Sequence, residues 1–337
     1  MGSWLLYGAT GRTGTLIAEE AVARGHRPTL AGRDPDRLRR LAERLDVPWI
    51  AGSTADMSRL IGDARLVLLA AGPFGATAPP VLRACLDAGV HYLDIANEIP
   101  VATAALAADG EARRRGVTVL PAVGFGTVAS DGLARYVADQ VPGAVRLDLA
   151  VILGNDGSSA GARESTLHVL GGGGQIRRGG RLVRRRLGAD ARRQRTPIGL
   201  RTLAPVPTAD LVVTAHTTEI PDITVSFPVP MPPLAAKLAM PALPLLMRAA
   251  AKLPQRATAA GRSDELNSYV WARATAADGR TAQMWARTGE GYAYSARAAM
   301  LAVEATLRSD PLGATTVARA FGPELSFEAG GELLASA

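Results

Sequence analysis

Gly8-Ala9-Thr10-Gly11-Arg12-Thr13-Gly14 is the stretch of sequence that decides the fold. The apolar run Trp4–Tyr7 comes directly before it and predicts a short strand. Apolar residues then recur at helical spacing over residues 16–22, and Gly25 ends the predicted helix. A glycine-rich turn between a strand and a helix is typical of a phosphate-binding turn, so the sequence predicts a dinucleotide-binding domain.

Each glycine of this stretch has a physical role in such a domain. Gly8 permits the tight turn, Gly11 lets the backbone approach a pyrophosphate, and Gly14 lets the helix pack close to the strand. The helix then presents free N–H groups and the positive end of its dipole, and both attract phosphate.

The end of the second predicted strand indicates which dinucleotide binds. Residues 28–31 form this strand, and Gly32, Arg33 and Asp34 follow it. Enzymes that prefer NAD usually carry an acidic residue here, which bonds the ribose 2′-hydroxyl. Arg33 instead favours the 2′-phosphate of NADP(H), with Arg12 as a second candidate clamp, although Arg33 could also be a solvated loop residue. We expect Asp34 to cap the helix over residues 36–45.

Strands and helices alternate as far as residue 121, so we predict an α/β fold with a Rossmann doubly wound parallel sheet. The continuous apolar strand over residues 66–71 ends in a glycine turn, at the edge of the sheet where ligands bind. The residues expected to contact NADP(H) are Gly8, Thr10, Gly11, Arg12, Thr13, Gly14, Arg33, Ala71, Gly72, Pro73 and Phe74.

Beyond residue 125 the pattern changes to that of a second domain. We predict a helix over 130–141 and strands over 145–153, 212–213, 223–227 and 269–272, which belong to a second sheet. The chain length also favours two domains, which we place at residues 1–125 and 126–337.

Five motifs of the sequence, taken in their order along the chain, resemble those of a known family. They are the glycine stretch 8–14, Ala31-Gly32-Arg33, residues 70–74, residues 91–94 and the stretch 124–131. The series resembles saccharopine dehydrogenase-like oxidoreductases, and in particular the branch that includes the trans-acting enoyl reductases of polyketide lipid assembly. Residues 289–292 also resemble that branch. One departure is Gly126-Thr127, which stands where similar proteins often carry Asp-Ser.

The resemblance implies both an architecture and a reaction. It implies a Rossmann domain and then an α+β substrate and dimerisation domain with a mixed sheet, with C-terminal helices packing back on the Rossmann domain. It also implies an NADPH-dependent reductase of a conjugated C=C (enoyl) or C=N (imine) bond, in lipid, polyketide or other secondary metabolism. The alternative is a non-catalytic NADP(H)-binding redox sensor or scaffold protein.

The sequence offers more than one candidate for the proton donor of such a reductase. No Tyr has a Lys four residues later, which excludes the mechanism of short-chain dehydrogenases. Tyr92 and His168 are candidate donors, and Asp94 and Asp131 are candidate orienting groups, but solvent could also supply the proton. His168 could equally bond a backbone group.

Charge is concentrated in one segment of this basic chain, whose net charge is +7. Residues 177–195 hold nine arginines and a single acid, Asp190. This segment is either a solvated loop or hairpin, or a docking site for an acidic acyl-carrier protein or a pantetheine phosphate. We expect no nucleic-acid partner, because aromatic residues are not interleaved with the arginines.

Several further features limit the expected class of protein. Cys85 is the only cysteine and the four histidines are scattered, so we expect no metal. No signal peptide precedes the first strand, and a cytoplasmic location is expected. The proline-rich stretch 227–253 is a poor membrane span. We expect it to line an apolar pocket, form core or a homodimer surface, or contact a membrane peripherally.

Overall fold

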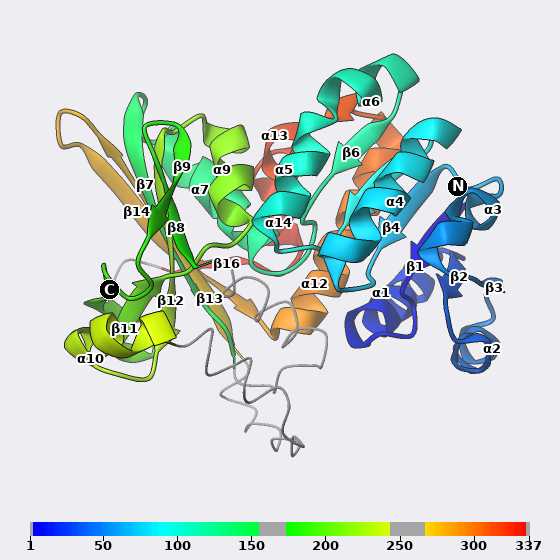
Figure 1. The fold of residues 1–337 in the computed structure, drawn as a ribbon, viewed down its shortest axis with the longest axis horizontal. Coiled ribbons are helices and arrows are strands. Elements are labelled where there is room, and N and C mark those ends of the chain that lie inside the picture. The colour runs from blue at the N-terminus through cyan, green and yellow to red at the C-terminus, as the bar shows by residue number, and fades with distance from the viewer. Residues whose placement is uncertain (1–2, 155–172, 243–266, 335–337) are drawn as a thin grey trace.

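The computed structural model describes residues 3–154, 173–242 and 267–334, arranged as two β-sheets with helices between and around them (Figure 1). The first sheet is parallel, with the strand order β15-β6-β5-β4-β1-β2-β3. Its strands are β1 (Trp4–Tyr7), β2 (Thr29–Gly32), β3 (Trp49–Ala51), β4 (Leu66–Leu69), β5 (His91–Asp94), β6 (Thr118–Leu120) and β15 (Gly313–Ala314). This sheet confirms the predicted α/β Rossmann fold.

Helices cover both faces of the first sheet, as a doubly wound fold requires. They are α1 (Arg12–Ala23), α2 (Pro35–Leu45), α3 (Met57–Ile61), α4 (Phe74–Ala88), α5 (Ile99–Ala107), α6 (Asp109–Arg115) and α12 (Gly291–Ser309). Side chains of β1 alternate between the two cores. Leu6 packs with Ile17 of α1, whereas Leu5 packs with Val81 of α4.

The second sheet is mixed, which confirms the predicted α+β character of the second half. Its main path is β10-β11-β12-β7-β13-β14-β16; β12 and β7 run parallel, and the other neighbours on this path run antiparallel. The strands are β7 (Ala144–Ile152), β8 (Gly174–Arg178), β9 (Arg181–Arg185), β10 (Arg192–Thr196), β11 (Gly199–Pro205), β12 (Asp222–Val229), β13 (Ser268–Ala276), β14 (Thr281–Gly289) and β16 (Glu332–Leu334).

The helices α7 (Thr127–Asp139) and α9 (Asp210–Thr218) lie between the second sheet and the first domain (Figure 1). α7 packs on β7, β13 and β14, and α9 packs on both α7 and α5. One continuous core therefore extends from β1 through α12 and α7 to β7 and β13. The smaller helices of this half are α10 (Pro233–Ala239), α13 (Val317–Phe321) and α14 (Glu324–Glu328).

The C-terminal part of the chain returns to the first domain. α12 packs along α1, and β15 pairs in parallel with β6 and completes the sheet. The first domain thus contains two segments, one that ends with β6 at Leu120 and one that begins with α12 at Gly291.

Two local predictions were wrong. Val212 and Val213 do not form a strand but lie inside α9, because two β-branched residues are outweighed by the helical packing of Leu211 and Ala215 against the core. The pattern of residues 101–115 predicts a single helix, but the structure divides this stretch into α5 and α6 at Ala108. The pattern also predicts a turn over 155–161 and a helix over 163–170. These residues, and the stretch 243–253, lie outside the described residues.

Candidate cofactor and active site

The glycine loop after β1 has the shape that the sequence predicts. Gly8 has a φ of 93°, and a Cβ there would lie 2.7 Å from the backbone of Ala70. A Cβ on Gly14 would lie 2.2 Å from the carbonyl oxygen of Gly8, so only glycine lets α1 begin this close to β1. A Cβ on Gly11 would have more room, with its nearest neighbour 3.3 Å away, and Gly11 is exposed.

The N-terminus of α1 is suited to bind a pyrophosphate. Gly11 occupies the N-cap position and supplies no side-chain cap, so the first turn of this 12-residue helix keeps backbone N–H groups for a ligand. Thr10 and Thr13 flank this turn and are partly exposed. The arrangement fits the diphosphate of a dinucleotide, which is anionic and needs a close backbone approach.

Basic side chains surround the place where a ribose 2′-phosphate would lie. Arg33 follows β2 directly and is exposed. Asp34, the acidic residue beside it, accepts a hydrogen bond from the backbone N–H of Arg37 at 3.0 Å and caps α2, as predicted. The Arg37 guanidinium donates to the carbonyl of Thr10 at 2.6 Å and so ties α2 to the glycine loop. Arg37 was not anticipated from the sequence.

The loop after β4 lies at the same edge of the first sheet as the glycine loop after β1. We call this edge, at which the parallel strands end, the cofactor edge. Ala71 and Pro73 are partly exposed and Gly72 is exposed, and the Thr77 hydroxyl holds the loop by donating to the carbonyl of Ala71 at 2.6 Å. The Phe74 side chain is only 7% exposed and packs in the core beneath α4. The Phe74 ring also lies beside this loop, since a Cβ on Gly72 would be 3.7 Å from the ring.

The loops after β5 and β6 form the far end of the edge. Glu98 occupies the N-cap position of α5 without a side-chain cap, is 7% exposed, and accepts a hydrogen bond from the backbone N–H of Asn97 at 3.0 Å. Phe125 follows β6, and its backbone N–H donates to the hydroxyl of Ser295 on α12 at 2.9 Å. Its ring packs edge-on against Tyr294, with the ring centroids 5.7 Å apart. The second half of the chain thus holds this loop in place.

Residues of α12 also reach the glycine loop itself. The guanidinium carbon of Arg12 lies 3.8 Å from the ring centroid of Tyr292, and an Arg12 nitrogen lies 3.9 Å from a carboxylate oxygen of Glu290. Glu290 also caps α12 by accepting a hydrogen bond from Ala293 N–H at 2.6 Å. Sequence reasoning did not connect Glu290 and Tyr292 with Arg12, because local patterns contain no signal for a contact between residues so far apart in the chain.

Tyr92 and Asp94, which we predicted as catalytic candidates, lie in the core. Both side chains are 0% exposed, and the Tyr92 hydroxyl donates to Asp94 at 2.8 Å. Burial, together with Asp94, raises the pKa of Tyr92 well above its ordinary value. Because its side chain has no contact with solvent, Tyr92 is not placed to protonate a substrate directly, which corrects that prediction.

Asp94 has a positioning role instead. One carboxylate oxygen accepts the backbone N–H groups of both Ala96 and Ala122 at 2.9 Å, which joins the loop after β5 to the loop after β6. Burial raises the pKa of Asp94 to about 6, and these backbone N–H groups oppose the shift.

Asp131 is likewise buried, at 1% exposure, in α7. It accepts a hydrogen bond from Ala318 N–H of α13 at 3.1 Å. Burial raises its pKa to about 7, and Asp210 on α9 contributes to the shift. This position joins three helices and does not reach a substrate, so the prediction that Asp131 orients the reacting groups directly is also corrected. His168, the remaining candidate, lies outside the described residues.

Within residues 3–154, 173–242 and 267–334, no cluster of three or more His, Cys, Asp or Glu side chains is placed to hold a metal ion. Over the same ranges, no helix is long and apolar enough to span a membrane. Cys85 is fully buried, and its burial raises the pKa of the thiol well above the ordinary value.

A parallel sheet with a glycine turn, an uncapped helix and an arginine after its second strand defines a Rossmann-type nucleotide-binding protein. Residues 4–120 match the family described as the saccharopine dehydrogenase NADP-binding domain. The N-terminal domain is therefore similar to the NADP-binding domains of this family.

Curated relatives resemble part of the chain. A trans-acting enoyl reductase of Mycobacterium ulcerans is 30% identical over 138 residues, which are 38% of this chain and 33% of that protein. A probable mitochondrial saccharopine dehydrogenase-like oxidoreductase of Arabidopsis thaliana is 31% identical over 185 residues, which are 46% of this chain and 40% of that protein. The chain thus spans well under half the length of these relatives.

One solved structure shares the fold of the whole chain. Saccharopine dehydrogenase (L-Glu forming) from Saccharomyces cerevisiae superimposes with a TM-score of 0.63 over 99% of this chain and 100% of that chain. The sequence identity is 13%, so this similarity shows the fold alone.

Proposed function

We propose that the protein is an NADPH-dependent reductase that acts on a polarised double bond, either the conjugated C=C of an enoyl compound or a C=N bond. The proposal rests on the edge of the first sheet that carries the glycine loop and Arg33. The helix α12 contacts the glycine loop through Tyr292 and Arg12. It also contacts the loop after β6, where the Ser295 hydroxyl accepts the Phe125 N–H. Two similarities support the proposal: that of residues 4–120 to NADP-binding domains, and that of 138 residues of the chain to a trans-acting enoyl reductase.

Bound NADPH would supply a hydride, that is, two electrons and a proton, and would leave as NADP⁺. The protein's own residues would bind and orient it. The N-terminus of α1 would hold the diphosphate, while Arg33 and Arg37 would pair with the 2′-phosphate. The substrate atom that gains charge takes a proton from solvent or from an ionisable side chain at this edge. Glu98 and Tyr292 are the side chains to test first.

The substrate is proposed to arrive on an acidic carrier protein. The arginines of residues 177–195 are divided between the hairpin β8–β9 and strand β10. Arg184 and Arg186 are exposed, and Arg185 pairs with Asp190 at 2.7 Å. Exposed like charges on one hairpin attract an acidic partner over a distance and raise the rate of association. A second copy of the chain and a lipid surface are further partners that the sequence led us to expect.

The test is the consumption of NADPH by the purified protein with an α,β-unsaturated pantetheine thioester and with a cyclic imine, each assayed separately. NADPH deuterated at the transferable position should place one deuterium in the reduced product. Gly11→Val serves as the control that should not bind cofactor. Tight binding of NADPH without turnover of either substrate would contradict the proposal and favour the redox sensor or scaffold.

A further inference from the structure

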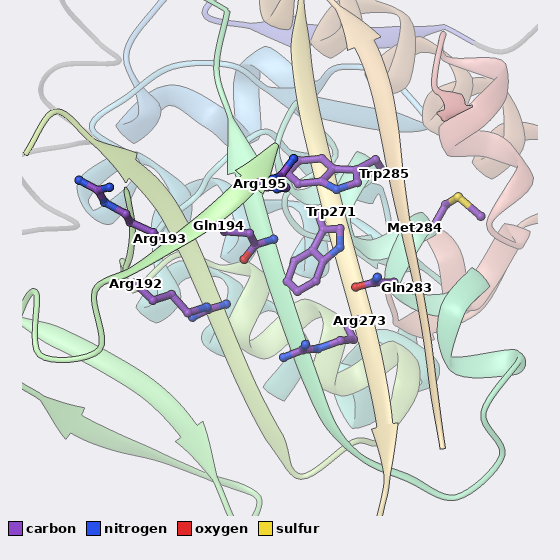
Figure 2. Close-up of a pocket in the computed structure, with 9 residues that line it drawn as sticks. All are labelled: Arg192, Arg193, Gln194, Arg195, Trp271, Arg273, Gln283, Met284 and Trp285. Carbon is purple, nitrogen blue, oxygen red and sulfur yellow. The ribbon is translucent and has the colours of Figure 1, made fainter. Parts of the chain in front are cut away.

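A groove of about 400 Å³ lies on the second sheet, away from the cofactor edge. It is lined mainly by cationic and aromatic side chains, among them Arg192 and Arg195 of β10, Trp271 and Arg273 of β13, and Trp285 of β14 (Figure 2). Its volume lies within the range of small-molecule sites.

The groove belongs to the face of the sheet that does not pack on α7. Leu147 and Leu149 of β7, and Val270 and Ala272 of β13, are part of the main core. Because side chains alternate along a strand, Asp148, Trp271 and Arg273 point to the opposite face. The register pairs Arg273 with Asp148 on one side and with Gln283 on the other, so these residues form one row across the groove floor.

The positive charge in the groove is only partly balanced. Asp148 is 0% exposed and is shared by two cations, Arg146 at 2.9 Å and Arg273 at 3.1 Å. Arg192 has no ion-pair partner among the described residues. Buried nitrogens of both Arg192 (Nη2) and Arg273 (Nε) have no hydrogen-bond partner there either. A buried N–H group without an acceptor is costly, and such groups usually face a bound ion or water.

Arg192 and Arg273 also repel each other. Figure 2 shows both side chains extending toward the centre of the groove from opposite sides. Burial lowers the pKa of the Arg192 guanidinium, Asp148 opposes this, and the positive charge of Arg273 adds to the lowering. An anion between the two guanidinium groups would remove this repulsion and provide the missing acceptors.

We infer that this groove is a second ligand site, distinct from the NADP site, and that it binds an organic phosphate. Arginine pairs with phosphate oxygens by short, charge-assisted and often bidentate hydrogen bonds, and several arginines together favour a dianion over a single carboxylate. The rings of Trp285, which is partly exposed, and of Trp271 supply an apolar wall for the organic part of the ligand.

Isothermal titration with phenyl phosphate, inorganic phosphate and benzoate tests the inference. NADPH is kept saturating, so that the 2′-phosphate and diphosphate positions of the cofactor site are occupied. We expect one equivalent of phenyl phosphate to bind, more tightly than inorganic phosphate because of the apolar wall, and more tightly than benzoate because of its charge. Binding should weaken as salt increases. Inorganic phosphate binding as tightly as phenyl phosphate would contradict the part of the inference that concerns an organic ligand.

Arg192→Gln should weaken the binding of phenyl phosphate by about tenfold or more. Arg195→Gln tests the same site from the exposed end of β10 if Arg192→Gln fails to fold. Arg181→Gln, an exposed arginine of β9 outside the groove lining, is the matched control and should change nothing. The NADPH affinity should stay the same in every variant. Absence of binding by the wild type, or equal binding by wild type, Arg192→Gln and Arg195→Gln, would overturn the inference.

Discussion

The Arg12 guanidinium stacks on the ring of Tyr292 at 3.8 Å, which joins the glycine loop at the start of the chain to the helix that follows the second domain. Arg12 also faces Glu290 at 3.9 Å, and Glu290 caps the same helix. The position of α12 therefore affects a side chain of the phosphate loop. Cofactor binding and the packing of the second half of the chain are physically linked through this contact.

Replacing Tyr292 tests that link. Tyr292→Leu should weaken NADPH binding about two- to fivefold, because a partly exposed cation–π contact contributes about 0.5–1 kcal/mol. Tyr292→Phe keeps an aromatic ring and should bind NADPH like the wild type. Fluorescence titration with NADPH measures both. Equal affinities for all three proteins would show that the stacking does not preorganise Arg12.

Arg33 should determine the choice of cofactor. We expect the wild type to bind NADPH at least about tenfold more tightly than NADH, a difference of about 1.4 kcal/mol. Arg33→Asp should erase this preference, because a carboxylate repels the 2′-phosphate and accepts a hydrogen bond from the 2′-hydroxyl of NADH. Arg40→Asp, also exposed but on α2, is the control for a general change of charge. A wild type with equal affinities would show that Arg33 is a solvated loop residue.

Gly11 and Gly14 should respond differently to an added side chain. At Gly14 a methyl group would meet the Gly8 carbonyl at 2.2 Å, so Gly14→Ala should lower the free energy of unfolding by about 1–3 kcal/mol. At Gly11 the backbone is extended, with φ −75° and ψ 164°, which valine tolerates. Gly11→Val should fold yet lose NADPH binding. Thermal unfolding and NADPH titration of both variants distinguish the roles, and unchanged binding by Gly11→Val would mean that the phosphate loop is misplaced.

Asp131 should make stability depend on pH. Its pKa in the folded protein, about 7, lies above the ordinary value, so the folded protein keeps a proton that the unfolded chain has released. Stability is therefore lost as the pH rises toward 7, and Asp131→Asn avoids this loss. From about pH 5 to about pH 8 the variant should gain on the order of 1–3 kcal/mol relative to the wild type.

Urea unfolding at both pH values measures this difference. The exposed Asp36→Asn is the control, and its difference from the wild type should be the same at both pH values. A pH-independent difference between Asp131→Asn and the wild type would mean that the Asp131 carboxyl is ionised in the fold throughout this range.

The arginine hairpin should matter only for a carrier-bound substrate. Exchanging Arg184, Arg185 and Arg186 for Gln should leave melting and NADPH affinity nearly unchanged, because exposed charges contribute little to stability. Reduction of a carrier-bound substrate should slow at low salt, while a small free substrate should react at the wild-type rate. If the triple variant reduces both the carrier-bound and the free substrate at wild-type rates, the hairpin is a solvated surface that does not bind a carrier protein.

The parts of the site that follow from local chemistry were predictable. The spacing of the glycines, the absence of an acid after β2 and the cap at Asp34 all depend on residues a few positions apart, and the structure has them as expected. The prediction that Tyr92 donates a proton was wrong because a central strand of a parallel sheet is covered on both faces. A polar residue in such a strand is buried whichever way its side chain points. The contact between Arg12 and Tyr292 depends on how distant segments pack, which no local pattern contains.

The strand β15 has a consequence for how the protein is made. Gly313 and Ala314 pair with β6, so a nascent chain that ends anywhere in the second domain has a bare sheet edge at β6. Unpaired strand edges invite aggregation, and synthesis is slow compared with local folding. The sheet of the nucleotide-binding half therefore cannot be completed during translation before Gly313 and Ala314 have emerged. A gene fragment that encodes only residues 1–125 would yield an incomplete, aggregation-prone sheet.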